Sequence, residues 1–174
     1  GERLIAAMRQ RVLILDGGLG TMIQRQNLDD SDFVWCGCCQ CRPESKRGCN
    51  DLLSMTRSDL IASIHRQYLE AGADIIETNS FNANAISLAD YDLGEHAAAI
   101  NLAAARVARD TADRYMADNQ RRVWVAGSIG PTSKSLTMAA NLGDDTTWDT
   151  MADAYLTQAR SLIEGGVDLL IIET

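Results

Sequence analysis

The chain has 174 residues, of which 46% are hydrophobic and 23% charged, an ordinary composition for a globular domain with one core. Its net charge of -8 and pI near 4.7 argue against nucleic acid or an anionic membrane as the main partner, because both bind basic surfaces. No apolar run approaches the roughly 18 residues of a membrane span, and the first residues lack the apolar core of a signal peptide. We therefore expect a cytoplasmic protein with a small, neutral or zwitterionic ligand.

Helical and strand-like segments alternate along the chain. Short apolar runs without alternation predict strands that are buried on both faces, as in a parallel sheet covered by helices. In chain order the predicted elements are a helix over 2–10, a strand over 12–15, a helix over 56–70 with Thr56 as N-cap, a strand over 74–77, a short helix or turn over 84–91, a helix over 95–116, a strand over 123–126, a helix from Thr147 as N-cap to the stop at Gly165-Gly166, and a strand over 168–172. Such alternation predicts parallel strands joined by right-handed crossovers.

Four strands in 174 residues match the spacing of a barrel that stops half-way, since a complete (β/α)8 barrel needs about 250 residues. A doubly wound dinucleotide-binding sheet requires Gly-x-Gly-x-x-Gly and an acidic residue at a later strand end, and the run Gly17-Gly18-Leu19-Gly20 does not fit. We predict an α/β fold of the TIM-barrel type over residues 1–174, limited to about four βα units of its amino-terminal half. An irregular, cysteine-rich loop is expected over about 28–50.

One sequence pattern occurs twice in the chain. It consists of a helix end, Gly-x-Asp, a short apolar strand and Glu-Thr. The first copy runs from Glu70 to Thr78 and the second from Glu164 to Thr174, so the αβ unit is repeated. Polar residues follow the first copy at once, in the string Glu77-Thr78-Asn79-Ser80-Phe81-Asn82. Because parallel αβ folds build their sites at the carboxyl ends of strands, these residues are candidates for a ligand site.

The first predicted strand also ends in a polar turn, Asp16-Gly17-Gly18-Leu19-Gly20. Glycines at a strand end let backbone N–H groups approach a ligand closely, although such a run also forms ordinary tight turns. The position of Asp16 at a strand end favours the ligand site.

Several strings resemble the amino-terminal, homocysteine-binding module of the cobalamin-dependent methionine synthase family. They are the residues of 15–24, 49–53, 68–82, 87–91, 100–105, 126–132 and 162–174. The resemblance covers nearly the whole chain and implies a (β/α)8 barrel that binds homocysteine and methylates its sulfur to form methionine. In that family, cysteines hold zinc, the metal turns the homocysteine thiol into a thiolate, and a later domain carries methylcobalamin.

The resemblance also implies which residues bind the substrate. The family's zinc cysteines stand in Gly-x-Asn-Cys and Gly-Gly-Cys-Cys phrases that this chain lacks, so we expect them beyond Thr174 and expect neither zinc nor activity in this chain alone. The chain matches the amino-acid end of the site, with Glu173 placed to hold the ammonium group. For Glu77 and Glu173, the alternative is a strand-end carboxylate bound to neighbouring amides. The implied substrate-binding residues are Asp16, Gly17, Gly18, Glu77, Thr78, Asn79, Ser128, Gly130, Thr132 and Glu173, and no catalytic residue is implied.

All five cysteines lie between Cys36 and Cys49, where the chain departs from the family pattern. The spacing Cys-x-Cys-Cys-x-Cys lacks the paired Cys-x-x-Cys of common zinc folds, so a drifted loop or a reading-frame slip is preferred to a new metal site. His65 and His96 have no partner at a telling spacing and are predicted to be packing or surface residues.

Three alternatives stay open. A related homocysteine methyltransferase uses a betaine or sulfonium donor instead of cobalamin, and the folate and cobalamin domains of a parent chain would distinguish the two. A half-barrel leaves open sheet edges, so a non-catalytic αβ module that assembles with a partner or with itself is the second alternative. A barrel enzyme for phosphorylated substrates is the third, although the phosphate sites of barrels usually follow strands 7 and 8.

Overall fold

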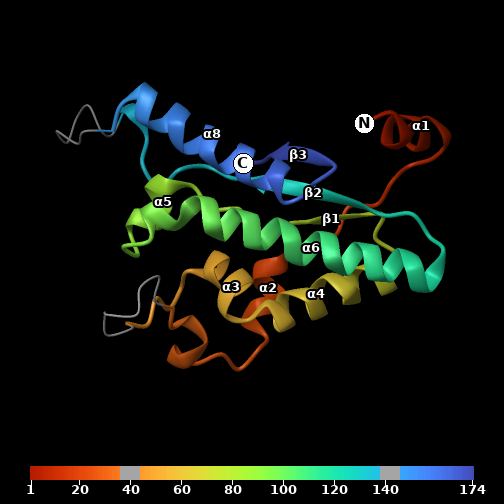
Figure 1. The fold of residues 1–174 in the computed structure, drawn as a ribbon, viewed down its shortest axis with the longest axis horizontal. Coiled ribbons are helices and arrows are strands. Elements are labelled where there is room, and N and C mark those ends of the chain that lie inside the picture. Colours follow the sequence, from red (N-terminus) through yellow and green to blue (C-terminus); the bar gives the residue numbers. More distant parts are fainter. Residues whose placement is uncertain (36–43, 138–145) are drawn as a thin grey trace.

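The computed structural model describes residues 1–35, 44–137 and 146–174, and its centre is a parallel sheet (Figure 1). The sheet contains β1 (Ile75–Glu77), β2 (Trp124–Ile129) and β3 (Leu169–Ile172), in that order. Glu77 pairs with Ala126, and Ser128 pairs with Ile171. The predicted parallel α/β class is confirmed.

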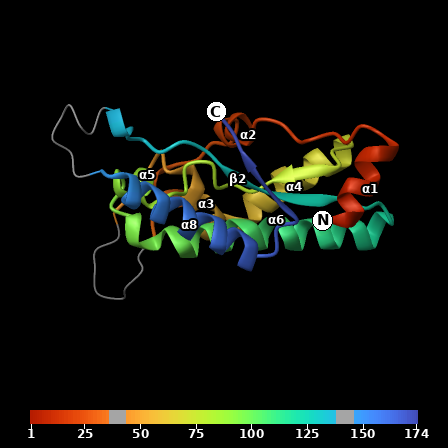
Figure 2. The same ribbon diagram turned by 90° about the horizontal axis from the view of Figure 1, so that it is seen from above.

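Helices α4 (Ser58–Ala71), α6 (Ala97–Asn119) and α8 (Trp148–Glu164) pack side by side with α6 in the middle, and Figure 2 shows α6 and α8 along one side of β2. Helices α6 and α8 come close together at Ala105 and Gly165, where both residues are small. A Cβ on Gly165, at the end of α8, would lie only 2.4 Å from the Cβ of Ala105. The described helices and 3-10 turns are α1 (Glu2–Gln10), α2 (Leu19–Gln24), η1 (Asp30–Phe33), η2 (Asn50–Leu52), α3 (Leu53–Thr56), α4 (Ser58–Ala71), α5 (Ala85–Ala89), η3 (Gly94–His96), α6 (Ala97–Asn119) and α8 (Trp148–Glu164).

The repeated Gly-x-Asp phrase has the same structural role in both copies. The two glycines that follow the helices, Gly72 and Gly166, have positive φ angles of 110° and 95°, which end the helix and turn the chain into the sheet. The aspartate two residues later then accepts a hydrogen bond from a backbone N–H of the preceding segment. Asp74 binds Ile14 N at 2.9 Å, and Asp168 binds Val125 N at 2.9 Å.

The prediction of a strand over 12–15 is wrong. In the structure this segment makes one isolated parallel bridge, between Leu15 and Ile75. The Asp74 carboxylate takes the N–H of Ile14, which a regular ladder would pair with a carbonyl. Val12 and Ile14 also remain 80% and 55% exposed, so this segment is not buried on both faces as predicted.

Two other boundary predictions have opposite outcomes. Thr147 caps α8 as predicted, since its hydroxyl accepts from Thr150 N. Thr56 does not cap α4, because it still belongs to α3 and its hydroxyl donates to Leu52 O at 3.4 Å. The segment expected to be irregular over 28–50 contains η1 and the start of η2, and residues 36–43 lie outside the described part.

No helix in the described ranges is both long enough and apolar enough to span a bilayer.

Candidate functional site

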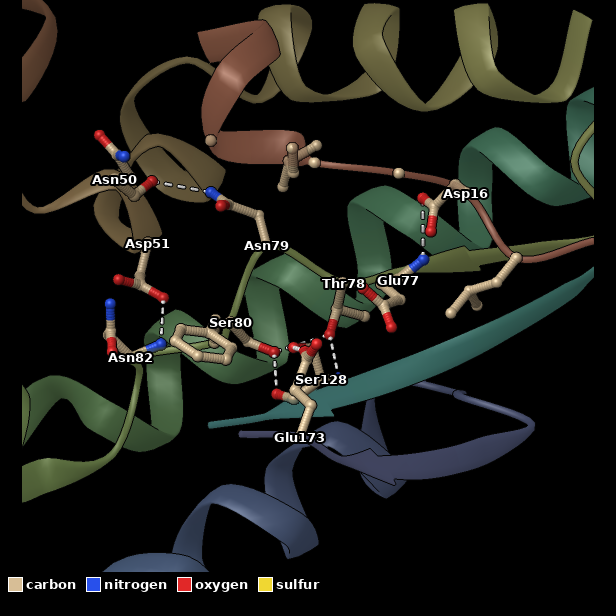
Figure 3. A pocket seen from close by; sticks show the side chains of 16 residues that line it. Asp16, Asn50, Asp51, Glu77, Thr78, Asn79, Ser80, Asn82, Ser128 and Glu173 are labelled. Atoms are coloured by element: carbon tan, nitrogen blue, oxygen red, sulfur yellow. Dashed lines mark hydrogen bonds between the residues drawn. The ribbon is translucent and has the colours of Figure 1, made fainter. Parts of the chain in front are cut away.

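A pocket of about 480 Å³ opens where β1, β2 and β3 end, between the sheet and the segments before α2 and α3 (Figure 3). It contains eight of the ten predicted substrate-binding residues, and Gly130 and Thr132 are the two outside it. The lining residues are Leu15, Asp16, Gly17, Gly18, Leu19, Gly20, Asn50, Asp51, Glu77, Thr78, Asn79, Ser80, Phe81, Asn82, Ser128 and Glu173.

Asp16 is fixed to the end of β1. Its backbone N–H donates to Ile75 O at 2.9 Å, and its Oδ2 accepts from Glu77 N at 3.1 Å. Its Oδ1 is buried and has no hydrogen-bond partner among the described residues. Burial, together with the charges of Glu77 and Glu173, raises the pKa of Asp16 to about 7, although the Glu77 N–H opposes the rise.

Glu77 and Glu173 join Asp16 as three of the four carboxylates that line the pocket, and Asp51 is the fourth. Burial and the charge of Glu173 raise the pKa of Glu77 to about 6. Glu173 accepts a short hydrogen bond from the Ser128 hydroxyl, and its backbone N–H donates to Ile129 O at 3.1 Å. Among the described lining residues there is no Lys, Arg or His to neutralise this group.

Asn79 and Asp51 join the loop after β1 to the turn before α3. Asn79 Nδ2 donates to Asn50 O at 2.7 Å and to Ser54 Oγ at 3.1 Å. Asp51 Oδ1 accepts from Asn82 N at 3.0 Å, and burial raises the pKa of Asp51 to about 6. Asp51 was not predicted as a site residue, although it belongs to the string 49–53 that carries the family resemblance.

The predicted glycines differ in their surroundings. Gly17 and Gly18 line the pocket, where added side chains would meet Tyr68 Oη and Thr21 Oγ1 at 3.3 Å. Gly130 lies against Phe81, and a Cβ there would come within 2.6 Å of the Phe81 carbonyl. Thr132 is half-buried beyond the pocket, and its hydroxyl donates to Lys134 O at 2.5 Å.

Of the cysteines, only Cys49 falls in the described part, where burial raises the pKa of its thiol to about 12. The question of a metal site in the cysteine loop concerns residues 36–41, which lie outside the described ranges. Within those ranges no three His, Cys, Asp or Glu side chains are grouped to hold a metal ion. His65 is fully buried in the core, as a packing residue would be, and His96 stacks edge-on against Trp35.

A parallel sheet backed by helices, with an acidic pocket at its carboxyl edge, is the arrangement of αβ folds of the barrel type, which build their sites at this edge. The family model of homocysteine S-methyltransferases matches residues 13–174, and the chain belongs to this family.

Solved structures support the same fold. The metallated form of the homocysteine methyltransferase MmuM from Escherichia coli is 23% identical with a TM-score of 0.66, over 97% of this chain and 56% of that one. Its oxidized form is 25% identical with a TM-score of 0.68, over 96% and 55%. The chain thus spans just over half the length of these proteins, which agrees with a half-barrel.

Proposed function

We propose that the pocket binds the amino-acid end of homocysteine, in the amino-terminal half of a barrel that methylates the homocysteine sulfur to give methionine. The observation that carries this proposal is the cluster of Asp16, Glu77 and Glu173, which has no Lys, Arg or His beside it among the described lining residues. Together with the family membership, it makes an α-amino acid with a free ammonium group the best-supported ligand.

The charges of the pocket favour such a ligand. The mutual repulsion of the three carboxylates contributes to the raised pKa values of Asp16 and Glu77, and an ammonium group between them would relieve it. We place this group near Glu77 and Glu173. The ligand carboxylate is then best accommodated near Gly17 and Gly18, which line the pocket without side chains of their own, so that their backbone N–H groups can approach it.

The described residues have a limited share in the chemistry. A metal ion bound to the homocysteine sulfur supplies a thiolate at neutral pH. In the described ranges no three His, Cys, Asp or Glu side chains, the pocket carboxylates included, are arranged so that they could hold one metal ion. We assign to these residues the binding and orientation of the amino acid.

For the methyl donor we propose the methionine synthase type, in which the rest of the barrel and the cobalamin and folate domains of a parent chain are the partners. The sequence strings around 15–24 and 68–82 support this choice. The alternative is a betaine or sulfonium donor. To distinguish the two, the rate of methyl transfer to homocysteine by a parent chain is measured with methylcobalamin and with a sulfonium compound as the donor. A cytoplasmic location belongs to the same proposal and rests on the sequence alone.

The binding proposal is tested by isothermal titration of this chain with L-homocysteine under reducing conditions. Replacement Glu173→Gln is expected to weaken binding about tenfold, the loss of one charged contact to the ammonium group. Glu164→Gln, which neutralises an exposed carboxylate at the end of α8, is the matched control and should leave the affinity unchanged. Absence of saturable binding by the wild type, or equal binding by Glu173→Gln, would contradict the proposal.

A further inference from the structure

Strand β1 leaves the sheet before β2 does. The last paired residues of the two strands are Glu77 and Ala126, and Thr78 N still donates to Ala126 O at 2.9 Å. Strand β2 continues to Ile129, with Ser128 paired to Ile171 of β3 on one side only. On the β1 side the backbone N–H and C=O of Ser128 therefore need other partners, because both lie in the buried interior.

Two side-chain hydroxyls replace the missing strand. Ser128 N donates to Thr78 Oγ1 at 3.0 Å, and Ser80 Oγ donates to Ser128 O at 2.7 Å. The two hydroxyl oxygens are 2.6 Å apart. Figure 3 shows the three side chains together at the end of β2.

Counting protons assigns the direction of each bond. A hydroxyl carries one proton, and Ser80 gives its proton to the Ser128 carbonyl. The bond between the two hydroxyls must then be donated by Thr78. The bonds run from the Thr78 hydroxyl to the Ser80 hydroxyl, from Ser80 to the Ser128 carbonyl, and from the Ser128 backbone N–H back to Thr78 Oγ1. We call this closed arrangement of two hydroxyls and the backbone of Ser128 the hydroxyl ring. The three bonds form a chain in which each polarises the next, from the Ser128 N–H through the two hydroxyls to the Ser128 carbonyl.

The hydroxyl ring is also held from the helix layer. Gln158 of α8 is fully buried, and its Nε2 donates to Ser80 O at 2.7 Å. This contact joins residues that are 78 positions apart in the sequence. The loop that starts at Thr78 is therefore fixed both to β2 and to α8.

The geometry points to a positioning role for this ring. Thr78 and Ser80 are almost completely buried, and the single proton of each hydroxyl is already used. The ring holds the backbone of Ser128, and the side-chain hydroxyl of Ser128 donates its proton to Glu173. We propose that Thr78 and Ser80 aim the Glu173 carboxylate at the ligand's ammonium group through Ser128, and that the Thr78 hydroxyl itself does not contact the ligand.

This inference rests on the proposed function, and Thr78→Val tests it because valine keeps the shape and removes the hydroxyl. The matched control is Thr111→Val, whose hydroxyl donates to Val107 O at 2.7 Å within α6. The ligands are L-methionine and 4-(methylsulfanyl)butanoate, which differ in the amino group, and their affinities are measured by titration calorimetry. Hydrogen exchange of the Ser128 amide is measured by NMR on the same samples without ligand.

In Thr78→Val we expect the Ser128 amide to exchange about tenfold faster, and the affinity for L-methionine to fall about tenfold. The affinity for the deaminated analogue should stay the same, and Thr111→Val should change neither quantity. Ser80→Ala, which removes the other hydroxyl, should reproduce the result and serves if Thr78→Val does not fold.

Equal weakening of both ligands would show a structural role alone and would overturn the proposal. Unchanged binding of L-methionine or unchanged exchange at Ser128 would overturn it as well. A wild type that binds L-methionine no better than the analogue would instead refute amino-group recognition, and the positioning role would fail with it. A failure of the proposed function is seen in the wild type, whereas a failure of the positioning role alone is seen only in the variants. The two failures are therefore distinguishable.

Discussion

The backbone N–H of Glu77 donates to the side chain of Asp16 at 3.1 Å, which brings the end of the first apolar segment to the end of β1. The contact places two carboxylates in one pocket with Glu173. Keeping such groups together costs stability, and that cost is measurable.

We expect Asp16→Asn to stabilise the chain at neutral pH. The pKa of Asp16 is about 7 when folded and 3.8 ordinarily, so between these values the folded chain holds a proton that the unfolded chain has lost. Stability from this group is present at low pH and falls as the pH rises toward 7. Asparagine removes the decline, so the free energy of unfolding should rise by ~1–2 kcal/mol at pH 7.5 and hardly at pH 4.

Urea unfolding at both pH values checks this expectation. Asp110→Asn, at an exposed position of α6, is the control and should show no such difference. A variant at Asp16 that is less stable at pH 7.5 than the wild type would show that the carboxylate is stabilised by the fold.

Replacing the buried aspartate of the first Gly-x-Asp phrase should destabilise the fold. Asp74 is 2% exposed and binds the Arg11 guanidinium with two hydrogen bonds of 2.7 Å. The bond from Arg11 lowers the pKa of Asp74, so its contribution is present at neutral pH and is lost in acid. Asp74→Asn leaves Arg11 without its charge partner and should lower Tm by roughly 3–8 °C at pH 7.

Differential scanning calorimetry gives the comparison for Asp74. The control, Asp113→Asn, removes an exposed carboxylate that lies 2.8 Å from Arg109 on α6. Because exposed pairs contribute little, its Tm should stay close to that of the wild type. Equal effects in the two variants would argue against a special role for the repeated aspartate.

His65 should make the fold sensitive to acid. Both ring nitrogens are buried without a hydrogen-bond partner among the described residues, and burial lowers the pKa to about 4. Between pH 4 and 6.5 the unfolded chain binds a proton that the folded chain does not, so this contribution to stability is lost as the pH falls. His65→Leu should therefore gain ~1–3 kcal/mol at pH 4.5 relative to pH 7.5.

Denaturant unfolding at several pH values measures that gain. A substitution at His96, the other histidine of the chain, should keep the acid sensitivity because His65 is still present. An unchanged pH profile in His65→Leu would mean that the imidazole is solvated in the folded state.

Gly130 should tolerate no side chain, although it lies outside the pocket. A Cβ at this position would be 2.6 Å from Phe81 O and 2.7 Å from the Phe81 ring. Gly130→Ala should cost ~1–3 kcal/mol of stability by displacing the loop that carries Asn79. Gly20→Ala is the control, since a Cβ there meets nothing within 4 Å. Equal stability of the two variants in urea would show that the loop yields easily.

The sequence predicted the fold class and most elements because apolar strands and helix stops occur in regular order. The prediction of a strand over 12–15 was wrong because the apolar pattern of these residues is the same as that of a regular strand. What differs is a side chain 60 residues away, Asp74, which takes the Ile14 N–H. Local periodicity carries no information on such a contact.

For the site, residues at strand ends were predictable because parallel strands end at one edge of a sheet. The pocket contains Asp16, Glu77 and Glu173 for that reason, while their roles in binding remain predictions. Gln158 was not predicted, since one glutamine on a helix resembles any surface residue until the helix is placed. Its buried contact with Ser80 exists only in the folded chain.

The most direct test compares L-homocysteine with 4-sulfanylbutanoate, which lacks only the amino group, by titration of the wild-type chain at pH 7.5. If the carboxylates recognise the ammonium group, L-homocysteine should bind at least about tenfold more tightly. Equal affinities, or tighter binding of the deaminated compound, would contradict the assignment of this pocket.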